Sequence, residues 1–197
     1  MSTEAVHKVR RNRAQRFLRL IASALDPRAW AHLVKIVNYY NYTHLQELRK
    51  AQVARSANIS PTASFANGQN IEIGPHVTLG ADCRIWAGPG KARVVIGADA
   101  LFAPDVMVTA STYRYNDGSP VTRQAMDEAD ILIGDDCWIG RGAILLAGTE
   151  LGRGVIVGAH SVVRGKFPDN AIIAGSPAKI VGQREVSKPS TQTEGSI

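Results

Sequence analysis

The sequence predicts a mainly β protein, a solenoid of short parallel strands that follows an α-helical arm. Two observations carry this prediction. From about residue 59 onward, large apolar side chains recur every six residues, whereas the first 50 residues repeat at the helical spacing of three and four. A chain of 197 residues with 45% hydrophobic residues can bury one sizeable core and add a smaller element.

The six-residue period is clearest in the second half of the chain, where every sixth residue from Ile133 to Val163 is aliphatic. A period of six suits neither an amphipathic helix nor a hairpin sheet, but it suits triangular coils of three short strands joined by tight turns. The positions are Ile73, Leu79, Ile85, Ile96, Phe102, Val108, Ile133, Ile139, Leu145, Leu151, Val157 and Val163, with Ile59, Phe65 and Ile71 as an earlier, shifted set.

The neighbours of these apolar residues predict a narrow interior. Four residues after most of them stands a small or modest side chain, and glycine often follows directly, where a turn would crowd a side chain. Cys83 and Cys137 both occupy the fourth following place, so we expect them to be buried as small apolar residues. Their spacing matches no disulfide framework or zinc motif, and a reducing compartment is the simpler expectation.

Residues 1–52 predict the helical arm. Ala14, Phe17, Leu18, Ile21 and Leu25 share one stripe of a helix, and Asp26 with Pro27 offers an N-cap and a first helical residue for a second helix from about residue 27. Thr43 and Gln46 have the spacing of a capping box for a short third helix.

Positive charge is concentrated in this arm. Residues 1–55 contain eleven Lys/Arg and three Asp/Glu, a net charge of +8, so the remaining 142 residues carry −2 of the total +6. Three interpretations stay open. The helices could pack on the rest of the protein or a neighbouring subunit, or lie on an anionic membrane surface. Nucleic-acid binding is disfavoured because no reader motif accompanies the charge.

One segment interrupts the solenoid. Residues 113–130 lack the period, and an irregular segment of this length inside a regular coil is more often functional than idle. We therefore expect an excursion loop that builds one wall of a site. The predicted organisation is an arm over residues 1–52, a solenoid over 53–183 and a flexible tail over 184–197.

Three motifs within this organisation carry a resemblance: IGDDCWIG from Ile133, VGAHSVV from Val157 and AGSPAKIV from Ala174. On these residues the chain resembles the hexapeptide-repeat acyltransferases, above all the sugar, exopolysaccharide and lipopolysaccharide O-acetyltransferases. The resemblance covers residues 59–183. It implies a left-handed parallel β-helix, a homotrimer, acetyl-CoA as acyl donor in the groove between subunits, and no metal.

The resemblance also implies cofactor-binding residues, namely Arg141, Ala159, Arg164 and Lys179. The three cations could meet the phosphates of coenzyme A by charge-assisted hydrogen bonds, but each could equally be a solvated surface residue.

Relatives carry a catalytic histidine in the excursion, in a pattern like His-x-Tyr-x-Asp followed by proline and glutamine. Here Tyr113 occupies the histidine position, and Tyr115, Asp117 and Gln124 match the rest. A phenol is a poor general base at neutral pH. Three explanations stay open: Tyr113 or Asp117 accepts the proton; an amine or self-assisting acceptor needs only positioning; or the protein binds without catalysing. His160, about two coils away, is a weaker candidate base.

The acceptor is less well determined. Galactoside and maltose acetyltransferases carry acidic acceptor contacts where this chain reads Trp86-Ala-Gly-Pro-Gly90, and none is present here. We assign Trp86, which could stack on a sugar or be structural, and Asn116 as acceptor-binding candidates. This departure favours a sugar hydroxyl or amine of a bacterial surface-glycan precursor over a free disaccharide.

Two other classes of protein compete with this interpretation. Zinc carbonic anhydrases share the fold but need three histidines, and the coils hold only His76 and His160 at an unsuitable spacing. A non-catalytic coenzyme A-binding or assembly module is the serious alternative. Because no long apolar run or export signal occurs, we expect a cytoplasmic protein, with peripheral contact at the membrane as an option.

Overall fold

The computed structural model describes residues 12–185 of the chain. The chain divides between Tyr39 and Tyr40 into an N-terminal helical unit and a β unit. Within the described residues, no helix is both long and apolar enough to cross a membrane.

Two helices form the N-terminal unit, α1 (Arg13–Leu25) and α2 (Pro27–Tyr40). Asn12 caps α1 in a capping box: its Oδ1 accepts from the amide of Gln15 at 2.8 Å, and Gln15 Oε1 accepts from the amide of Asn12 at 3.1 Å. Asp26 caps α2 by accepting from the amide of Arg28 at 2.8 Å. Both predicted helices and the predicted start at residue 27 are confirmed.

The third helix begins differently from the prediction. A π-helical turn (Asn41–Leu45) continues α2 into α3 (Gln46–Lys50) without a break. Because Leu45, the residue before α3, has helical backbone angles and makes no side-chain cap, Thr43 does not start a new helix. The capping box expected at Thr43 and Gln46 is therefore wrong.

This last helical segment covers the first coil of the β unit. His44 Nδ1 lies 2.6 Å from the carbonyl oxygen of Ala63, and its ring lies 5.7 Å from that of Phe65. Glu47 Oε2 accepts from the amide of Gly68 at 2.7 Å. These contacts use polar groups at the open end of the solenoid that would otherwise face water.

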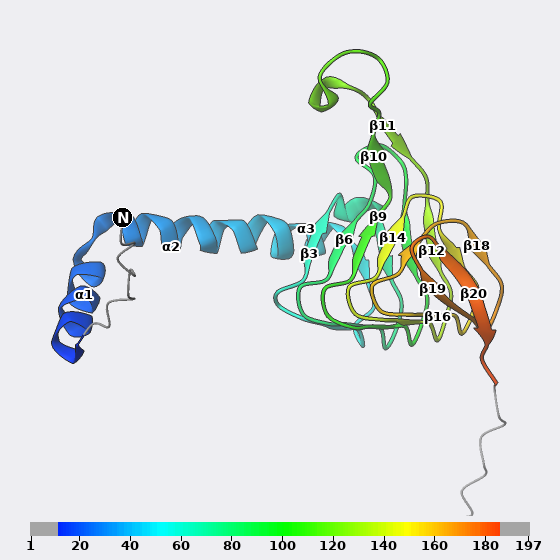
Figure 1. Cartoon of the computed structure of the whole chain (residues 1–197), viewed down its shortest axis with the longest axis horizontal. Helices are drawn as coiled ribbons and strands as arrows, with labels where there is room; N and C mark the ends of the chain where they lie inside the picture. Colours follow the sequence, from blue (N-terminus) through cyan, green and yellow to red (C-terminus); the bar gives the residue numbers. More distant parts are fainter. Residues whose placement is uncertain (1–11, 186–197) are drawn as a thin grey trace, which may run out of the picture. The chain divides into compact units, whose positions relative to one another are not determined.

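Three sheets of parallel strands form the solenoid, and each coil adds one strand to each sheet in turn (Figure 1). The first sheet contains β1 (Gln52–Val53), β4 (Ile71–Ile73), β7 (Val94–Ile96), β12 (Ile131–Ile133), β15 (Glu150–Leu151) and β18 (Lys166–Phe167). The second contains β2 (Asn58–Ile59), β5 (Thr78–Leu79), β8 (Leu101–Phe102), β13 (Trp138–Ile139), β16 (Ile156–Val157), β19 (Ala171–Gly175) and the antiparallel β20 (Ala178–Gln183). The third contains β3 (Ser64–Ala66), β6 (Arg84–Trp86), β9 (Met107–Thr109), β14 (Ile144–Leu146) and β17 (Val162–Val163).

The core lies inside the stacked coils, as the six-residue period predicts. All twelve positions of the main series are buried, as are Phe65 and Ile71 of the earlier set, whereas Ile59 is half-buried. Cys83 and Cys137 are buried free thiols, which confirms their predicted place in the interior. Burial raises the pKa of the Cys137 thiol to about 11, and its Sγ lies 3.2 Å from the carbonyl oxygen of Gly152.

Turn residues follow the same period. The third residue after an apolar position repeatedly has a left-handed backbone, as at Asp99, Asp136 and His160 with φ of 59°, 55° and 56°. Asp, Asn and Gly tolerate this conformation best, so these residues recur where the coil bends. Glycine directly after an apolar residue has a different cause: a Cβ on Gly140 would lie 2.6 Å from the amide nitrogen of Ala159 in the next coil.

The excursion is a β-hairpin that projects from the solenoid between β9 and β12 (Figure 1). Its strands are β10 (Ser111–Tyr113) and β11 (Met126–Glu128), paired antiparallel with Tyr113 opposite Met126. The loop between them contains a short 3₁₀ turn (Val121–Arg123). The buried Gln124 holds the loop together, because its Nε2 donates to the carbonyl oxygen of Ser119 at 2.6 Å.

At the other end of the described chain, β20 folds back on β19, and Arg184 Nη1 lies 2.8 Å from Asp136 Oδ2. Residues 186–197 of the predicted tail lie outside the described residues. The predicted boundaries of arm, solenoid and tail stay predictions.

Candidate functional site

The excursion hairpin and the solenoid together form an open pocket of about 570 Å³. Arg164 follows β17 at the corner where the third sheet ends, and the hairpin leaves the solenoid two coils earlier at the same corner, after β9. The stacking of coils therefore brings Arg164 beside the hairpin, although Arg164 follows the last hairpin residue, Glu128, by 36 residues. This pocket is lined by four of the predicted site residues, Tyr113, Asn116, Asp117 and Arg164. The other lining residues are Thr112, Arg114, Tyr115 and Asp127.

A second, narrower pocket of about 210 Å³ lies at the base of the hairpin. Arg164 also lines it, next to Thr109, Leu146 and Glu128. Thr109 and Leu146 are register partners at the ends of β9 and β14, so this pocket continues the edge of the third sheet. Arg164 therefore lines both pockets, the one under the hairpin and the one against the solenoid.

Asp117 is engaged in the turn of the loop. Its Oδ1 accepts from the hydroxyl of Ser119 at 2.6 Å and from the amide of Ser119 at 2.8 Å. These two bonds hold the pKa of Asp117 below its ordinary value, the hydroxyl contributing most. A carboxylate whose charged form is stabilised in this way is a weak proton acceptor at neutral pH.

Tyr113 occupies the end of β10, and nearly half of its side-chain surface is exposed. Tyr115, two residues further along the loop, is more exposed still. Both line the larger pocket, so the site presents two aromatic rings and the guanidinium groups of Arg114 and Arg164 to solvent. Such a combination can hold a sugar ring by stacking and an anionic group by charge.

Glu128 anchors the hairpin to the neighbouring coil. Its carboxylate accepts from three backbone amides, those of Gly90 at 2.8 Å, Lys91 at 3.0 Å and Ala92 at 3.2 Å. These bonds lower the pKa of Glu128, the Gly90 amide contributing most. A Cβ on Gly88 would lie 2.7 Å from Glu128 Oε2, so the glycine makes room for the carboxylate.

A surface ion pair also ties the two hairpin strands together. Arg114 Nε lies 2.6 Å from Asp127 Oδ1, and both side chains are more than half exposed. Exposed pairs of this kind contribute little to stability, about 0.2–1 kcal/mol. The pair helps to define one wall of the larger pocket, because both residues line it.

The other predicted cofactor residues lie elsewhere in the single chain. Arg141 and Ala159 follow β13 and β16, at the opposite edge of the third sheet, and both are exposed. Arg141 pairs with Asp105 at 2.9 Å. Lys179 is exposed on β20. None of the three lines either pocket around the hairpin.

Trp86, a predicted acceptor contact, ends β6 and is half-buried. Its register partner is Thr109, which lines the narrower pocket, but Trp86 itself lines neither pocket. It therefore lies one coil from the site, on the same sheet edge.

His160 lies in a turn of the solenoid rather than in the hairpin pocket. Its amide donates to the carbonyl oxygen of Arg141 at 2.8 Å, and a Cβ on Gly142 would lie 2.6 Å from its Nδ1. The ring therefore covers Gly142 in the preceding coil. His160 and Arg141 are neighbours at the same corner.

Sequence reasoning missed Glu128, Asp127 and Thr112 as parts of the site. The Glu128 carboxylate accepts hydrogen bonds from backbone amides 36 to 38 residues earlier in the chain. Such a contact leaves no periodic pattern in the sequence, because the position of Glu128 depends on the register of the hairpin. The usable signal was the pair of glycines at Gly88 and Gly90, which indicates a close approach of some other group. Among residues 12–185, no group of three or more His, Cys, Asp or Glu side chains could hold a metal ion.

Comparison with known protein families gives a match over residues 130–165 to the family described as "Bacterial transferase hexapeptide (six repeats)". A putative acetyltransferase of Saccharomyces cerevisiae is 31% identical over 173 residues, which cover 81% of this chain and 83% of the relative. WbbJ of Escherichia coli, a putative lipopolysaccharide biosynthesis O-acetyl transferase, is 38% identical over 45% of this chain.

The chain spans about half the length of two of the curated relatives it matches, 49% of WbbJ and 47% of a probable acetyltransferase of Mycobacterium tuberculosis. Among solved structures, a maltose O-acetyltransferase from Clostridium difficile superposes with a TM-score of 0.63 at 24% identity, covering 79% of this chain and 86% of that one. This likeness confirms the predicted left-handed β-helix.

Proposed function

Since the chain belongs to the hexapeptide-repeat acetyltransferase family, we propose that it transfers an acetyl group from acetyl-CoA to a hydroxyl or amino group of a sugar in a bacterial surface-glycan precursor. In this reaction the acceptor oxygen or nitrogen bonds to the acetyl carbon, the thioester bond breaks, and the acceptor proton ends on the coenzyme A thiol. The similarity to WbbJ supports the glycan class of acceptor.

The observation that carries this proposal is the pocket that the hairpin forms with Arg164. Two exposed tyrosines and Asn116 suit a polyhydroxylated ring, and Arg164 suits a phosphate of either the cofactor or the sugar precursor. We assign Tyr113 and Asn116 to orient the acceptor. Arg164 would hold the anionic group beside it.

Proton removal is the least usual feature of the proposed site. No histidine of residues 12–185 lines the pocket, and Ser119 donates two hydrogen bonds to Asp117 Oδ1. Two roles remain for the catalytic candidates. Tyr113 hydrogen-bonds the attacking group. Asp117 Oδ2, which takes part in neither bond to Ser119, is a weak base that takes the proton once the attacking atom has bonded to the acetyl carbon and become acidic. An amine acceptor needs the least help, because positioning beside the thioester supplies most of the rate.

The cofactor residues support a site shared between copies of the chain. Arg141 and Ala159 lie on the edge of the third sheet opposite Arg164 and the hairpin. In a homotrimer of parallel solenoids, the Arg141 corner of one copy would face the hairpin pocket of the next, with acetyl-CoA between them. Lys179 on β20 would then reach the cofactor from the end of the solenoid.

An outward apolar ladder on the second sheet supports such an assembly. The ladder consists of register partners on four successive strands: Leu101 on β8, Trp138 on β13, Ile156 on β16 and Ile172 on β19. Leu101 and Trp138 are about half exposed in the single chain. Large apolar side chains aligned on one face are typical of a protein interface.

Tyr113 in the histidine position favours a second function, a non-catalytic module that binds coenzyme A or supports assembly. The two functions differ in turnover. Incubation with acetyl-CoA and a panel of amino- and hydroxyl-bearing sugars, with free thiol as readout, is expected to show release for at least one acceptor. Coenzyme A binding without release on any acceptor, and none restored by Tyr113→His, would establish the binding module instead.

Two variants separate the candidate bases in this assay. Asp117→Asn is expected to lower kcat by roughly 10²-fold or more if the carboxylate takes the proton. His160→Asn serves as the matched control, since asparagine tolerates the left-handed turn at residue 160. Unchanged turnover in Asp117→Asn would remove that carboxylate from the mechanism, and a comparable loss in His160→Asn would implicate the imidazole.

The acceptor we propose is lipid-linked, which would place the enzyme at the cytoplasmic face of the membrane as a peripheral protein. The basic arm supports this location, because cationic amphipathic helices bind anionic lipid surfaces.

A further inference from the structure

The two helices of the arm have no core of their own. Neither α1 nor α2 contains a buried residue, and Phe17, Leu18, Leu25, Trp30 and Val34 each expose more than half of their side-chain surface. Helices of 13 and 14 residues are marginal in water without tertiary packing. The apolar stripes therefore need a surface to cover them.

The charge of the arm indicates what that surface is. Residues 12–39 contain Arg13, Arg16, Arg19, Arg28 and Lys35 against Asp26 alone, a net charge of +4. A second copy of the arm carries the same charge and would be repelled. An anionic surface attracts it, and an anionic lipid bilayer also accepts an apolar stripe along the whole length of a helix.

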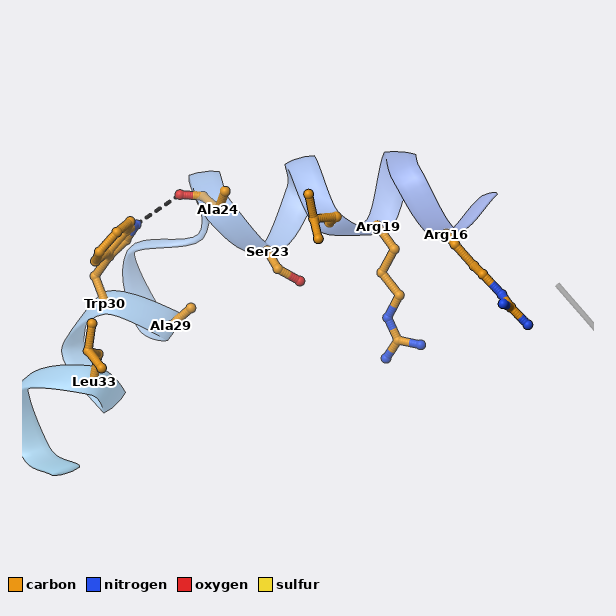
Figure 2. Close-up of a pocket in the computed structure, with 8 residues that line it drawn as sticks. Arg16, Arg19, Ser23, Ala24, Ala29, Trp30 and Leu33 are labelled. Atoms are coloured by element: carbon orange, nitrogen blue, oxygen red, sulfur yellow. Dashed lines mark hydrogen bonds between the residues drawn. The ribbon is translucent and has the colours of Figure 1, made fainter. Parts of the chain in front are cut away.

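The geometry where the helices meet fits one lipid component in particular. A notch of about 510 Å³ opens between α1 and α2, with Arg16 and Arg19 on the α1 side and Trp30 and Leu33 on the α2 side (Figure 2). The indole Nε1 of Trp30 donates to the carbonyl oxygen of Ala24 at 2.8 Å, which fixes the ring across the bend. The α1 wall of the notch carries the two arginines beside Leu20, Ser23 and Ala24, whereas the α2 wall is apolar.

We propose that the arm docks on an anionic bilayer, with the notch between α1 and α2 receiving a phospholipid whose phosphate meets Arg16 and Arg19 and whose acyl chain lies against Trp30 and Leu33. A tryptophan with its indole N–H bonded and its ring exposed suits the boundary between headgroups and chains. This inference rests on the proposed function only in naming the cytoplasmic membrane as the bilayer. Lipid binding is measured independently of acetyl transfer.

The test is co-sedimentation of the full chain with phosphatidylcholine vesicles, with and without phosphatidylglycerol. We expect partitioning to increase at least about tenfold with the anionic lipid and to weaken as salt is raised. The double variant Arg16→Glu/Arg19→Glu should lose at least about tenfold of this binding. Arg55→Glu/Arg153→Glu changes the charge equally at exposed residues of the β unit and should bind as the parent does.

Lipids brominated in the acyl chain test the apolar wall. They should quench tryptophan fluorescence in the parent and much less in Trp30→Phe. Equal binding to neutral and anionic vesicles, an equal loss in the control pair, or undiminished quenching in Trp30→Phe would each overturn the proposal. Release by millimolar inorganic phosphate would also overturn it, since a free phosphate site would then explain the binding. Coenzyme A binding is measured for the parent and for each of these variants. Retained coenzyme A binding would show that a loss of lipid binding is independent of the proposed enzyme activity.

Discussion

At the scale of single residues, Glu128 determines where the hairpin stands. One carboxylate accepts from the amides of Gly90, Lys91 and Ala92, so the excursion is attached to a coil that precedes it in the chain. Charged acceptors make stronger bonds to backbone amides than neutral ones. Because Glu128 also lines the narrower pocket, we expect its ionisation to couple the shape of the site to pH.

This coupling predicts a pH dependence with a definite sign. The pKa of Glu128 is lowered from its ordinary value of 4.5, so the anchor is fully present above that value and is lost as pH falls through the lowered pKa. Hydrogen exchange at Gly90, Lys91 and Ala92, corrected for intrinsic rates, should be protected at pH 7 and lose protection in acid. Glu128→Gln should be less protected already at pH 7.

Glu150→Gln is the matched control, because Glu150 is on the first sheet and pairs with Lys166 at 2.8 Å, away from the three amides. Protection at pH 7 that is equal in Glu128→Gln and the parent would show that the carboxylate does not hold the hairpin.

At the scale of elements, the coils are close-packed through their backbones as well as their side chains. A Cβ on Gly140 would lie 2.6 Å from the amide nitrogen of Ala159 and 2.7 Å from the carbonyl oxygen of Val157. Both atoms belong to strand and turn backbone of the next coil, and Gly140 itself donates to Val157 at 2.8 Å. Backbone held by such a ladder has no room to shift.

Gly140→Ala is therefore expected to lower the free energy of unfolding by roughly 1–3 kcal/mol. Gly182→Ala on β20 is the control, since the nearest atom to its Cβ would be a side-chain carbon of Ile172 at 3.7 Å, an ordinary contact. Urea unfolding followed by circular dichroism measures both. If the two variants are equally stable, the coils are more compliant than these distances imply.

At the scale of the whole molecule, the proposed trimer depends on a face rather than on one residue. Trp138 stands at the centre of the outward apolar ladder, with Leu101 on one side and Ile156 on the other. Burial of this ladder against a second copy would remove the exposed half of two large side chains from water, a gain of about 0.8–1.5 kcal/mol each if complete.

Sedimentation equilibrium is expected to give three times the 21.2 kDa of one chain. Trp138→Glu should dissociate the assembly and, because we place the cofactor between copies, weaken coenzyme A binding in parallel. Leu132→Glu, an exposed apolar residue of the first sheet, should leave both unchanged. A monomeric parent, or a dissociated variant with undiminished coenzyme A affinity, would contradict the shared site.

Much of the fold could be predicted from the sequence, because each coil is a local event. The interior of a triangular coil admits one large and one small side chain per six residues, so the period specifies the strands, the turns and the burial of Cys83 and Cys137. The caps at Asn12 and Asp26 are equally local. The short third helix is present as α3, but its start was mispredicted, because the preceding helix continues through Thr43 and leaves no free N-terminus there to cap.

The candidate site was only partly predictable. The length of residues 113–130 indicated an excursion, and the family motifs indicated Tyr113, Asp117 and Arg164, but no sequence pattern placed Arg164 beside the hairpin or Glu128 on the amides of residues 90–92. Those contacts exist because stacking by about 4.8 Å per coil returns distant residues to the same corner. The sequence by itself determined the coils. Only the tertiary structure decided which residues of different coils meet at one corner of the solenoid, because their meeting depends on how many residues lie between the coils and on the register of one hairpin.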